Sequence, residues 1–299
     1  MIDQKHPVEP SFLSTVTELD LARSKLVGFV EQTVRRADAD GAVVAMSGGI
    51  DSTLTAMLAA EALGSDRVLG LGLPCTDIDD SHAADTHAIA AALGIEFRAV
   101  SLQPLVHMFE DVVAPAVDTR CSDRALDNVV ARLRAVATYY AANALSYLVV
   151  GTANRSERLL GYFTKYGDGA ADLYPLGDLY KTEVRALAGT VGVPRRIIEK
   201  APTAGQEAGQ TDAADLGADY DVLDPFLRRV VDHGEDVVDA AAASRMDRDL
   251  AAAVTARFVD SRHKRDTPPT PQTGGWLVDR RTPPRDRADD LREYGTDAG

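Results

Sequence analysis

The stretch 41-GAVVAMSGGIDSTLTAMLAAEALG-64 decides the fold of this 299-residue chain. Residues 42–46 are apolar and β-branched at their centre, which is typical of a strand buried on both faces of a parallel sheet. Apolar residues at helical spacing follow, and Gly64 is a natural stop for that helix. The stretch therefore predicts a strand, a tight loop over 47–52 and a helix.

The loop Ser47-Gly48-Gly49-Ile50-Asp51-Ser52 has the composition of a phosphate-binding site. Two glycines let the backbone approach a ligand closely, and the first N–H groups of the new helix point at whatever lies there. The helix dipole adds partial positive charge, which favours an anion. No lysine closes the loop, so it is not a Walker A motif. The alternative is an ordinary strand-to-helix turn, but Ser-Gly-Gly-x-Asp-Ser in this context favours phosphate binding.

Asp51 places a carboxylate in this loop. A polyphosphate would repel that carboxylate unless a divalent cation lay between them. We therefore predict that Asp51 is a magnesium ligand. The loop also resembles the pyrophosphate-binding loop of the N-type ATP pyrophosphatases, which implies cleavage of ATP between the α- and β-phosphates and activation of a substrate oxygen as an adenylate.

Composition limits the class of protein. With 45% hydrophobic and 26% charged residues, the chain can bury one large or two small cores. A net charge of −14 argues against nucleic acid as a partner, because binding a phosphate backbone needs a concentrated basic face. We see no apolar run of membrane-spanning length and no signal-peptide core at the N-terminus, and therefore expect a cytoplasmic protein with no membrane partner. Cys75 and Cys121 lack metal-ligand spacing and are expected to be small buried residues.

The acidic charge has an unusual source, because aspartate greatly outnumbers glutamate and arginine greatly outnumbers lysine. A heavily hydrated acidic surface fits a cytoplasm of high salt, although a GC-rich genome would favour the same residues. On the halophilic interpretation, activity measured against potassium chloride concentration should rise to an optimum at high salt. An optimum in dilute buffer would contradict it.

Strands and helices alternate along the chain. Strands are predicted over 42–46, 68–73, 95–100 and 147–150, and helices over 17–36, 50–63, 80–93, 103–113, 125–145, 179–191, 218–231 and 246–260. This order indicates an α/β fold with a doubly wound, open parallel sheet of the Rossmann-like type and right-handed crossovers. We expect an N-terminal arm over 1–16, one α/β domain over 17–266, and a Pro-rich, charged and partly disordered tail over 267–299.

Two loops are expected to meet at one edge of this sheet. In open α/β sheets, ligands bind at the carboxyl ends of strands where the strand order reverses. Residues 47–52 and 151–157 both follow predicted strands, so together they predict a nucleotide cleft. Residues 201–217 form a polar, Gly-rich segment too long for a simple connection, and we interpret it as a lid.

Five motifs occur in a specific order: SGGIDS at 47, DNVVARLR at 127, GTANRSE at 151, GYFTKYGDGAADLYPLGDLYK at 161 and PTAGQEAGQTD at 202. Together they resemble the ammonia-dependent NAD synthetases over roughly residues 20–265, enzymes of the adenine nucleotide alpha hydrolase type. The resemblance implies that the nicotinate carboxylate of deamido-NAD attacks the α-phosphorus of ATP and pyrophosphate leaves. Ammonia then displaces AMP to give NAD.

The resemblance implies a role for each matching residue at an ATP site. Asp51 and Glu157 would hold Mg²⁺ against the phosphates of the co-substrate ATP, and Lys181 would contact those phosphates, which makes these three the predicted catalytic residues. The remaining ATP-binding residues would be Ser47–Ser52, Thr152 and Thr203. The less favoured alternative for Glu157 is a solvated carboxylate paired with Arg158. Taken alone, Thr152 would be a helix cap or turn residue, which is the commoner role for such a threonine.

A second group of residues is implied for deamido-NAD. Its members are Asn128, Arg132, Lys165, Asp168, Asp172, His263 and Lys264. Arg132 lies four residues after Asn128, so both project from one helix face, which suits a ribose or a pyrophosphate. Asp127 stands where the family has a glycine, which is a departure from the family motif. Asp168 lies in a Gly-Asp-Gly turn and has a turn role as its alternative.

Lysine is scarce in this chain, with only six residues. If arginine has replaced lysine wherever the two are interchangeable, the lysines that remain in motifs are those that need a compact point charge. Lys165, Lys181 and Lys264 are such residues, whereas the alternative for each is a solvated surface lysine.

No side chain of these groups is a nucleophile, so positioning and charge neutralisation are expected to supply the rate. Family members that use glutamine carry an additional N-terminal amidase domain, for which a first strand near residue 42 leaves no room. We therefore predict free ammonia, or ammonia from a separate glutaminase. The family resemblance also implies a homodimer, with the helix over 125–145 as the expected contact.

Two alternatives stay open at this point. One is another ATP pyrophosphatase, such as a tRNA-modifying enzyme or a GMP synthetase-like amidase, although the missing CxxC, the acidic charge and the dinucleotide motifs argue against both. The other is a non-catalytic protein that binds adenine nucleotides, which would bind ATP without turnover.

Overall fold

Four parallel strands form the sheet of this protein in the order β3-β2-β1-β4. The strands are β1 (Gly41–Ala45), β2 (Val68–Gly72), β3 (Glu96–Ala99) and β4 (Tyr147–Val149). The computed structural model describes residues 12–75, 77–117, 123–203 and 210–270. The first eleven residues of the predicted arm, Cys121, part of the predicted lid and most of the predicted tail lie outside these ranges.

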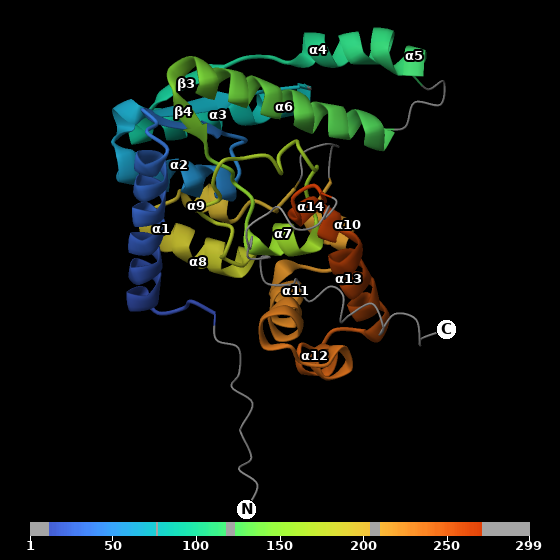
Figure 1. Cartoon of the computed structure of the whole chain (residues 1–299). Helices are drawn as coiled ribbons and strands as arrows, with labels where there is room; N and C mark the ends of the chain where they lie inside the picture. The colour runs from blue at the N-terminus through green and yellow to red at the C-terminus, as the bar shows by residue number, and fades with distance from the viewer. Residues whose placement is uncertain (1–11, 76, 118–122, 204–209, 271–299) are drawn as a thin grey trace, which may run out of the picture.

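Helices pack on both faces of the sheet, as predicted for a doubly wound fold (Figure 1). The helices that the sequence predicts are α1 (Val16–Arg36), α2 (Ile50–Leu63), α3 (Asp77–Leu93), α4 (Gln103–Met108), α6 (Asp123–Leu145), α8 (Lys181–Val191), α11 (Tyr220–Leu227) and α13 (Arg248–Asp260). Short helices that it does not predict are α5 (Ala114–Val117), α7 (Arg155–Leu160), α9 (Arg195–Ile198), α10 (Asp212–Leu216), α12 (Val237–Ala243) and α14 (Arg262–Arg265). Each spans too few residues to show helical periodicity.

The strand order reverses at β1. Val43 of this central strand pairs with Leu69 of β2 on one side and with Val149 of β4 on the other. Because β1 to β3 extend the sheet in one direction and β4 adds to the opposite side, the carboxyl ends of β1 and β4 flank the switch point. The loops that follow these two strands therefore meet at one sheet edge, as the sequence predicts.

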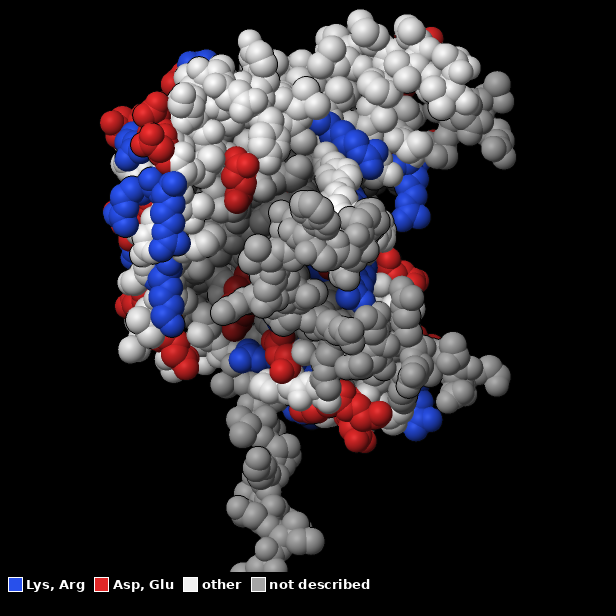
Figure 2. Space-filling view, viewed as in Figure 1, with Lys and Arg blue, Asp and Glu red and all other residues white. Residues whose placement is uncertain are grey.

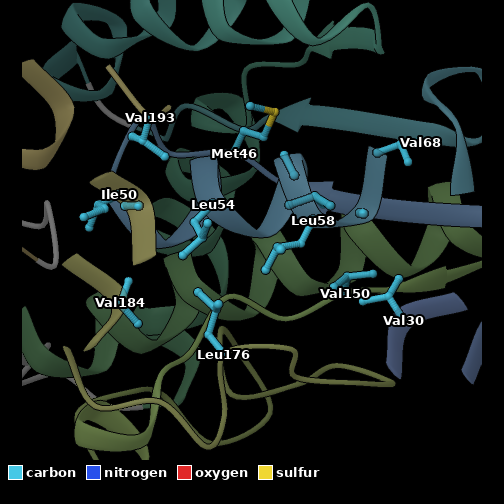
Figure 3. Packing of buried hydrophobic residues seen from close by; sticks show 14 of the residues in the cluster. Val30, Met46, Ile50, Leu54, Leu58, Val68, Val150, Leu176, Val184 and Val193 are labelled. Carbon is cyan, nitrogen blue, oxygen red and sulfur yellow. The ribbon is translucent and has the colours of Figure 1, made fainter. Parts of the chain in front are cut away.

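Alternation along β1 divides the core between the two sheet faces. Ala42 and Val44 belong to a buried cluster with Leu54 of α2 and Val184 of α8, while Val43 belongs to a second cluster on the other face. Figure 3 shows the first cluster, in which side chains of α1, α2 and α8 meet. Both faces of the strand are therefore buried, which explains its continuous apolar sequence.

A third cluster lies among the C-terminal helices. Leu160 of α7 packs with Tyr220 and Phe226 of α11 and with Phe258 of α13, and all four side chains are at most 2% exposed. This packing fixes α7 and α11 against each other beside the sheet edge (Figure 1). Among the described residues, no helix is long and apolar enough to cross a membrane.

Candidate functional site

Hydrogen bonds of its own serines fix the shape of the loop after β1. Ser52 Oγ accepts from the backbone N–H of Ser47 at 3.2 Å and donates to the carbonyl of Gly49 at 3.2 Å. Gly48 has φ of 75°, a conformation that favours glycine. Helix α2 begins at Ile50, so its first N–H groups have no intrahelical acceptor and face the sheet edge. The geometry is that of an anion-binding loop.

Asp51 and Glu157 meet at one buried ammonium group, although they lie far apart in the sequence. Lys181 Nζ donates to Asp51 Oδ2 at 2.5 Å and to Glu157 Oε1 at 3.2 Å. Lys181 is only 2% exposed and is the first residue of α8. The alternative pairing of Glu157 with Arg158 is not formed, because the Arg158 guanidinium donates to the carbonyl of Gly177.

Burial and neighbouring charges shift the pKa values of Lys181 and Glu157. Burial opposes the charged form of Lys181, but Asp51 and Glu157 outweigh it and raise the pKa of the ammonium above its ordinary value. Burial raises the pKa of Glu157 to about 7, against the lowering effect of Lys181 and with a further rise from Asp51. Both shifts follow from placing three charges in a space with little water.

Asp51 and Glu157 form a donor set that fits a magnesium ion bound together with phosphate. One nitrogen contacts both carboxylates, so a single small cation could also reach both. Among the described residues, no group of three or more His, Cys, Asp or Glu side chains could hold a metal. Two carboxylates completed by substrate phosphates and water are the usual arrangement for magnesium.

Asn154 joins the two acidic residues and is a site residue that we did not predict. Its Nδ2 donates to Asp51 Oδ1 at 2.9 Å, and its Oδ1 accepts from the backbone N–H of Glu157 at 3.0 Å. Asn154 is fully buried and caps α7. The signal was present in the sequence, because Asn-x-x-Glu is a capping box at the start of a helix.

Two threonines predicted at the ATP site differ in their position. Thr152 is half-buried in the loop after β4, at the same sheet edge as the loop after β1. Thr203 is exposed and is the last described residue before 204–209. The lid that we predict from residue 201 therefore falls partly outside the described residues.

The residues predicted for deamido-NAD form a second group between α6 and α14. Thr164 Oγ1 donates to Asn128 Oδ1 at 2.9 Å, and the guanidinium of Arg132 donates to the carbonyl of Lys165 at 3.3 Å. The ammonium of Lys165 donates to the carbonyl of His263. The structure therefore brings together residues from two of the five motifs and from α14.

Lys264 fastens the loop after α7 to α14. Its Nζ donates to the carbonyls of Gly161 and Phe163, both at 2.6 Å. Burial lowers the pKa of this ammonium, although the charge of Asp168 opposes the shift. Asp168 itself accepts from the backbone N–H of Thr164 at 2.8 Å, which is the turn role given above as its alternative.

Asp172 lies apart from this group. Its Oδ2 accepts from the backbone N–H of Val149 at 2.7 Å, and its Oδ1 accepts from Tyr139 at 3.4 Å. Burial, followed by the charge of Asp172, raises the pKa of Tyr139 to about 12. Tyr139 lies two turns further along α6 than Arg132. In this structure the carboxylate of Asp172 thus bonds to strand β4 and to a later turn of α6.

Comparison with known proteins identifies the family. The sequence pattern described as NAD synthase matches residues 22–268. The NH(3)-dependent NAD(+) synthetase of Methanosarcina mazei is 41% identical over 85% of this chain and 99% of its own length. The NH(3)-dependent NAD(+) synthetase of Halobacterium salinarum is 41% identical over 90% of this chain and 98% of its own.

Solved structures agree with the sequence comparison. An NMN synthetase from Francisella tularensis has a TM-score of 0.73 and 33% identity, over 85% of this chain and 98% of that one. The NH3-dependent NAD synthetase from Campylobacter jejuni has a TM-score of 0.70 and 27% identity, over 85% of this chain and 99% of that one. With the family pattern matched over 22–268 and relatives at 41% identity, this chain belongs to the NAD synthase family.

Proposed function

We propose that this protein is an ATP-dependent ligase that amidates deamido-NAD with ammonia and releases NAD, AMP and pyrophosphate. The observation that carries the proposal is the buried Asp51–Lys181–Glu157 trio beside an anion-binding loop at the switch point of the sheet. Relatives that match nearly their full length are NH(3)-dependent NAD(+) synthetases, which supports the same reaction.

The residues of the trio act on the phosphates of ATP. The N–H groups at the start of α2 bind the departing pyrophosphate, and Lys181 supplies a fixed positive charge beside it. Asp51 and Glu157 would hold Mg²⁺, which neutralises the charge that builds on the leaving group. No side chain of the trio is a nucleophile, because the substrate's own carboxylate attacks the α-phosphorus.

The group between α6 and α14 is proposed to bind deamido-NAD. Asn128 and Arg132 of α6 supply amide and guanidinium groups, Lys165 supplies an ammonium from the loop that follows α7, and His263 and Lys264 belong to α14. Such groups suit the ribose hydroxyls and pyrophosphate of a dinucleotide. Contacts from Asp168 and Asp172 stay predictions, as does the ATP contact of Thr203.

One reaction mixture tests the function. Protein, ATP, magnesium, ammonium and deamido-NAD should yield NAD, AMP and pyrophosphate in equal amounts. Formation of ADP and phosphate would point to a different class of enzyme. ATP binding without any product would point to the non-catalytic alternative.

The nitrogen donor is a separate prediction. With ammonium the purified protein should form NAD, and with glutamine alone, in ammonia-free buffer, NAD formation should fall to background. Addition of a glutaminase should restore NAD formation from glutamine, because a separate enzyme can supply the ammonia. NAD synthesis from glutamine by the purified protein would contradict the prediction.

The mononucleotide is a second candidate substrate, because one similar solved structure is that of an NMN synthetase. Nicotinate mononucleotide should therefore be offered in the same assay as deamido-NAD. We expect a kcat/KM at least about 10-fold higher for deamido-NAD, since the second nucleotide adds contacts that a mononucleotide cannot make. A preference for the mononucleotide would reassign the substrate and leave the amidation chemistry in place.

A homodimer is proposed through the face formed by α4 to α6. Large apolar side chains are exposed there, including Met108 at 60%, Val117 at 80%, Val136 at 65% and Tyr140 at 76%. Such a concentration of exposed apolar side chains usually marks an interface. Figure 1 shows these helices projecting at one side of the molecule, away from the C-terminal helices.

The proposed dimer can be tested by introducing a single charged residue at the interface. Val136→Asp should convert a dimer into a monomer, as measured by light scattering on a sizing column, because a buried aspartate at an interface has no partner. Val238→Asp is the matched control, since Val238 is also exposed but lies on α12. A monomeric wild-type protein, or a dimer unchanged by Val136→Asp, would contradict the proposal.

Nucleic acid is not proposed as a partner. The face seen in Figure 2 carries basic side chains, some of them in a strip over α1 at the left, together with acidic ones. The expectation rests instead on the net charge of −14, which opposes binding to a phosphate backbone. The cytoplasmic location, the separate glutaminase and the preference for high salt stay predictions.

A further inference from the structure

Helix α11 contacts the first two residues of α8, Lys181 and Thr182, from two positions that lie one turn apart. The Lys181 ammonium stands 5.5 Å from the centre of the Tyr220 ring, a distance at which a cation and a ring attract each other. Four residues later, Asp224 Oδ2 accepts from the backbone N–H of Thr182 at 2.9 Å. Residues four apart share a helix face, so α11 turns this face to both the side chain and the backbone at the start of α8.

Ser156 completes a bridge between three helices. Its hydroxyl donates to Asp224 Oδ1 at 2.6 Å and accepts from the backbone N–H of Lys181 at 2.9 Å. Ser156 directly precedes Glu157 on α7. The first two N–H groups of α8 are therefore bonded to a serine of α7 and to a carboxylate of α11.

Burying the carboxylate of Asp224 costs desolvation free energy, and packing alone would not require a carboxylate at this position. Asp224 and Ser156 are both 0% exposed. Burial raises the pKa of Asp224 to about 6, while the bonds from Ser156 and Thr182 lower it. An apolar residue of similar size would fill this space without the desolvation cost of a carboxylate. The three bonds instead hold the backbone of Lys181 in one place.

We propose that Asp224 is a positioning residue for Lys181, acting through Ser156 and the first turn of α8. This inference rests on the proposed function, because it assigns Asp224 to the ATP half of that reaction. Lys181 carries its charge at the end of a flexible four-carbon stem, so a displaced backbone moves the ammonium relative to the phosphates. A misplacement of about 1 Å can lower a rate by about 100-fold.

A substitution at Asp224 should change only the kinetic parameters for ATP. Residues proposed for deamido-NAD lie on α6, on the loop after α7 and on α14, and their hydrogen bonds do not include Asp224. A variant at Asp224 should therefore change the kinetic parameters for ATP while those for deamido-NAD stay constant. A loss of general stability would instead lower the folded fraction and leave both KM values unchanged.

The experiment compares Asp224→Asn and Ser156→Ala with Asp221→Asn. Asp221 lies on the same helix, but its side chain is 74% exposed and pairs with Arg185 at the surface. Activities are normalised to the folded fraction measured by circular dichroism at the assay temperature. We expect kcat/KM for ATP to fall about 10- to 100-fold in both bridge variants, with KM for deamido-NAD and the Asp221→Asn control within about 2-fold of wild type.

Calorimetric binding of magnesium-ATP provides a second readout that does not need turnover. Asp224→Asn should weaken binding in the wild-type background but add nothing in a Lys181→Met background. Equal weakening in both backgrounds, or unchanged kcat/KM for ATP per folded enzyme, would overturn the proposal. An inactive wild-type protein would overturn the proposed function instead, and the binding comparison would still decide the role of Asp224.

Discussion

Asp51→Asn is expected to reduce NAD synthesis by about 1,000-fold or more while the protein remains folded. Asparagine has the same shape, so the contact with Asn154 can be kept by its oxygen. Its amide group carries no charge and cannot act as a strong magnesium ligand. Its N–H₂ would also face the ammonium of Lys181, which leaves Glu157 as the remaining acceptor of this ammonium in the trio.

Glu61→Gln is the matched control for this prediction. Glu61 lies near the far end of α2, where it pairs with Arg23 at the surface. The same change from carboxylate to amide there should alter kcat by less than about 2-fold, since exposed pairs contribute little. Thermal unfolding separates folding from catalysis, and magnesium titration by calorimetry tests the ligand role directly. Full activity of Asp51→Asn would remove Asp51 from the catalytic residues.

The sheet and its switch point could be predicted from local sequence because their signals are local. A short apolar run, a Gly-Gly turn and a helical repeat each span few residues, and the alternation of such units implies a parallel sheet. The strand order β3-β2-β1-β4 then places the loops after β1 and β4 at one edge. The meeting of Asp51 and Glu157 follows from that topology.

The bridge through Asp224 could not be predicted in this way. Asp224 and Ser156 are 68 positions apart, and nothing in either sequence neighbourhood indicates the other. A weak signal was present, since Asp224 interrupts the apolar face formed by Tyr220, Leu223 and Leu227. A carboxylate on the buried face of a helix needs partners, so its position predicts a polar contact without identifying it.

The two hydrogen bonds of Asp172 could not be predicted from the sequence. Its carboxylate accepts from the backbone N–H of Val149 and from Tyr139, which lie 23 and 33 positions earlier in the chain. The isolated bridge between Val150 and Leu173 brings this segment beside the end of β4. The contact of Asp172 with deamido-NAD stays a prediction.

Lys181→Met should lower both activity and stability. The ammonium is buried between two carboxylates, and removal of one partner from a buried ion pair costs about 3 kcal/mol of unfolding free energy. Methionine keeps most of the apolar stem, so the loss reports on charge. Chemical denaturation measures it, with Lys25→Met at an exposed position of α1 as the control. Stability equal to wild type would mean that the two carboxylates do not need this cation.

Lys181→Arg separates charge from geometry. Guanidinium keeps the positive charge, so unfolding free energy should return to within about 1 kcal/mol of wild type. The guanidinium group is planar and larger than an ammonium, so it cannot take the ammonium's position between Asp51, Glu157 and a phosphate. We therefore expect kcat/KM for ATP to remain at least about 100-fold below wild type. Arginine greatly outnumbers lysine in this chain, which makes a lysine at this position informative. Activity within a few-fold of wild type in Lys181→Arg would show that charge alone suffices at this position.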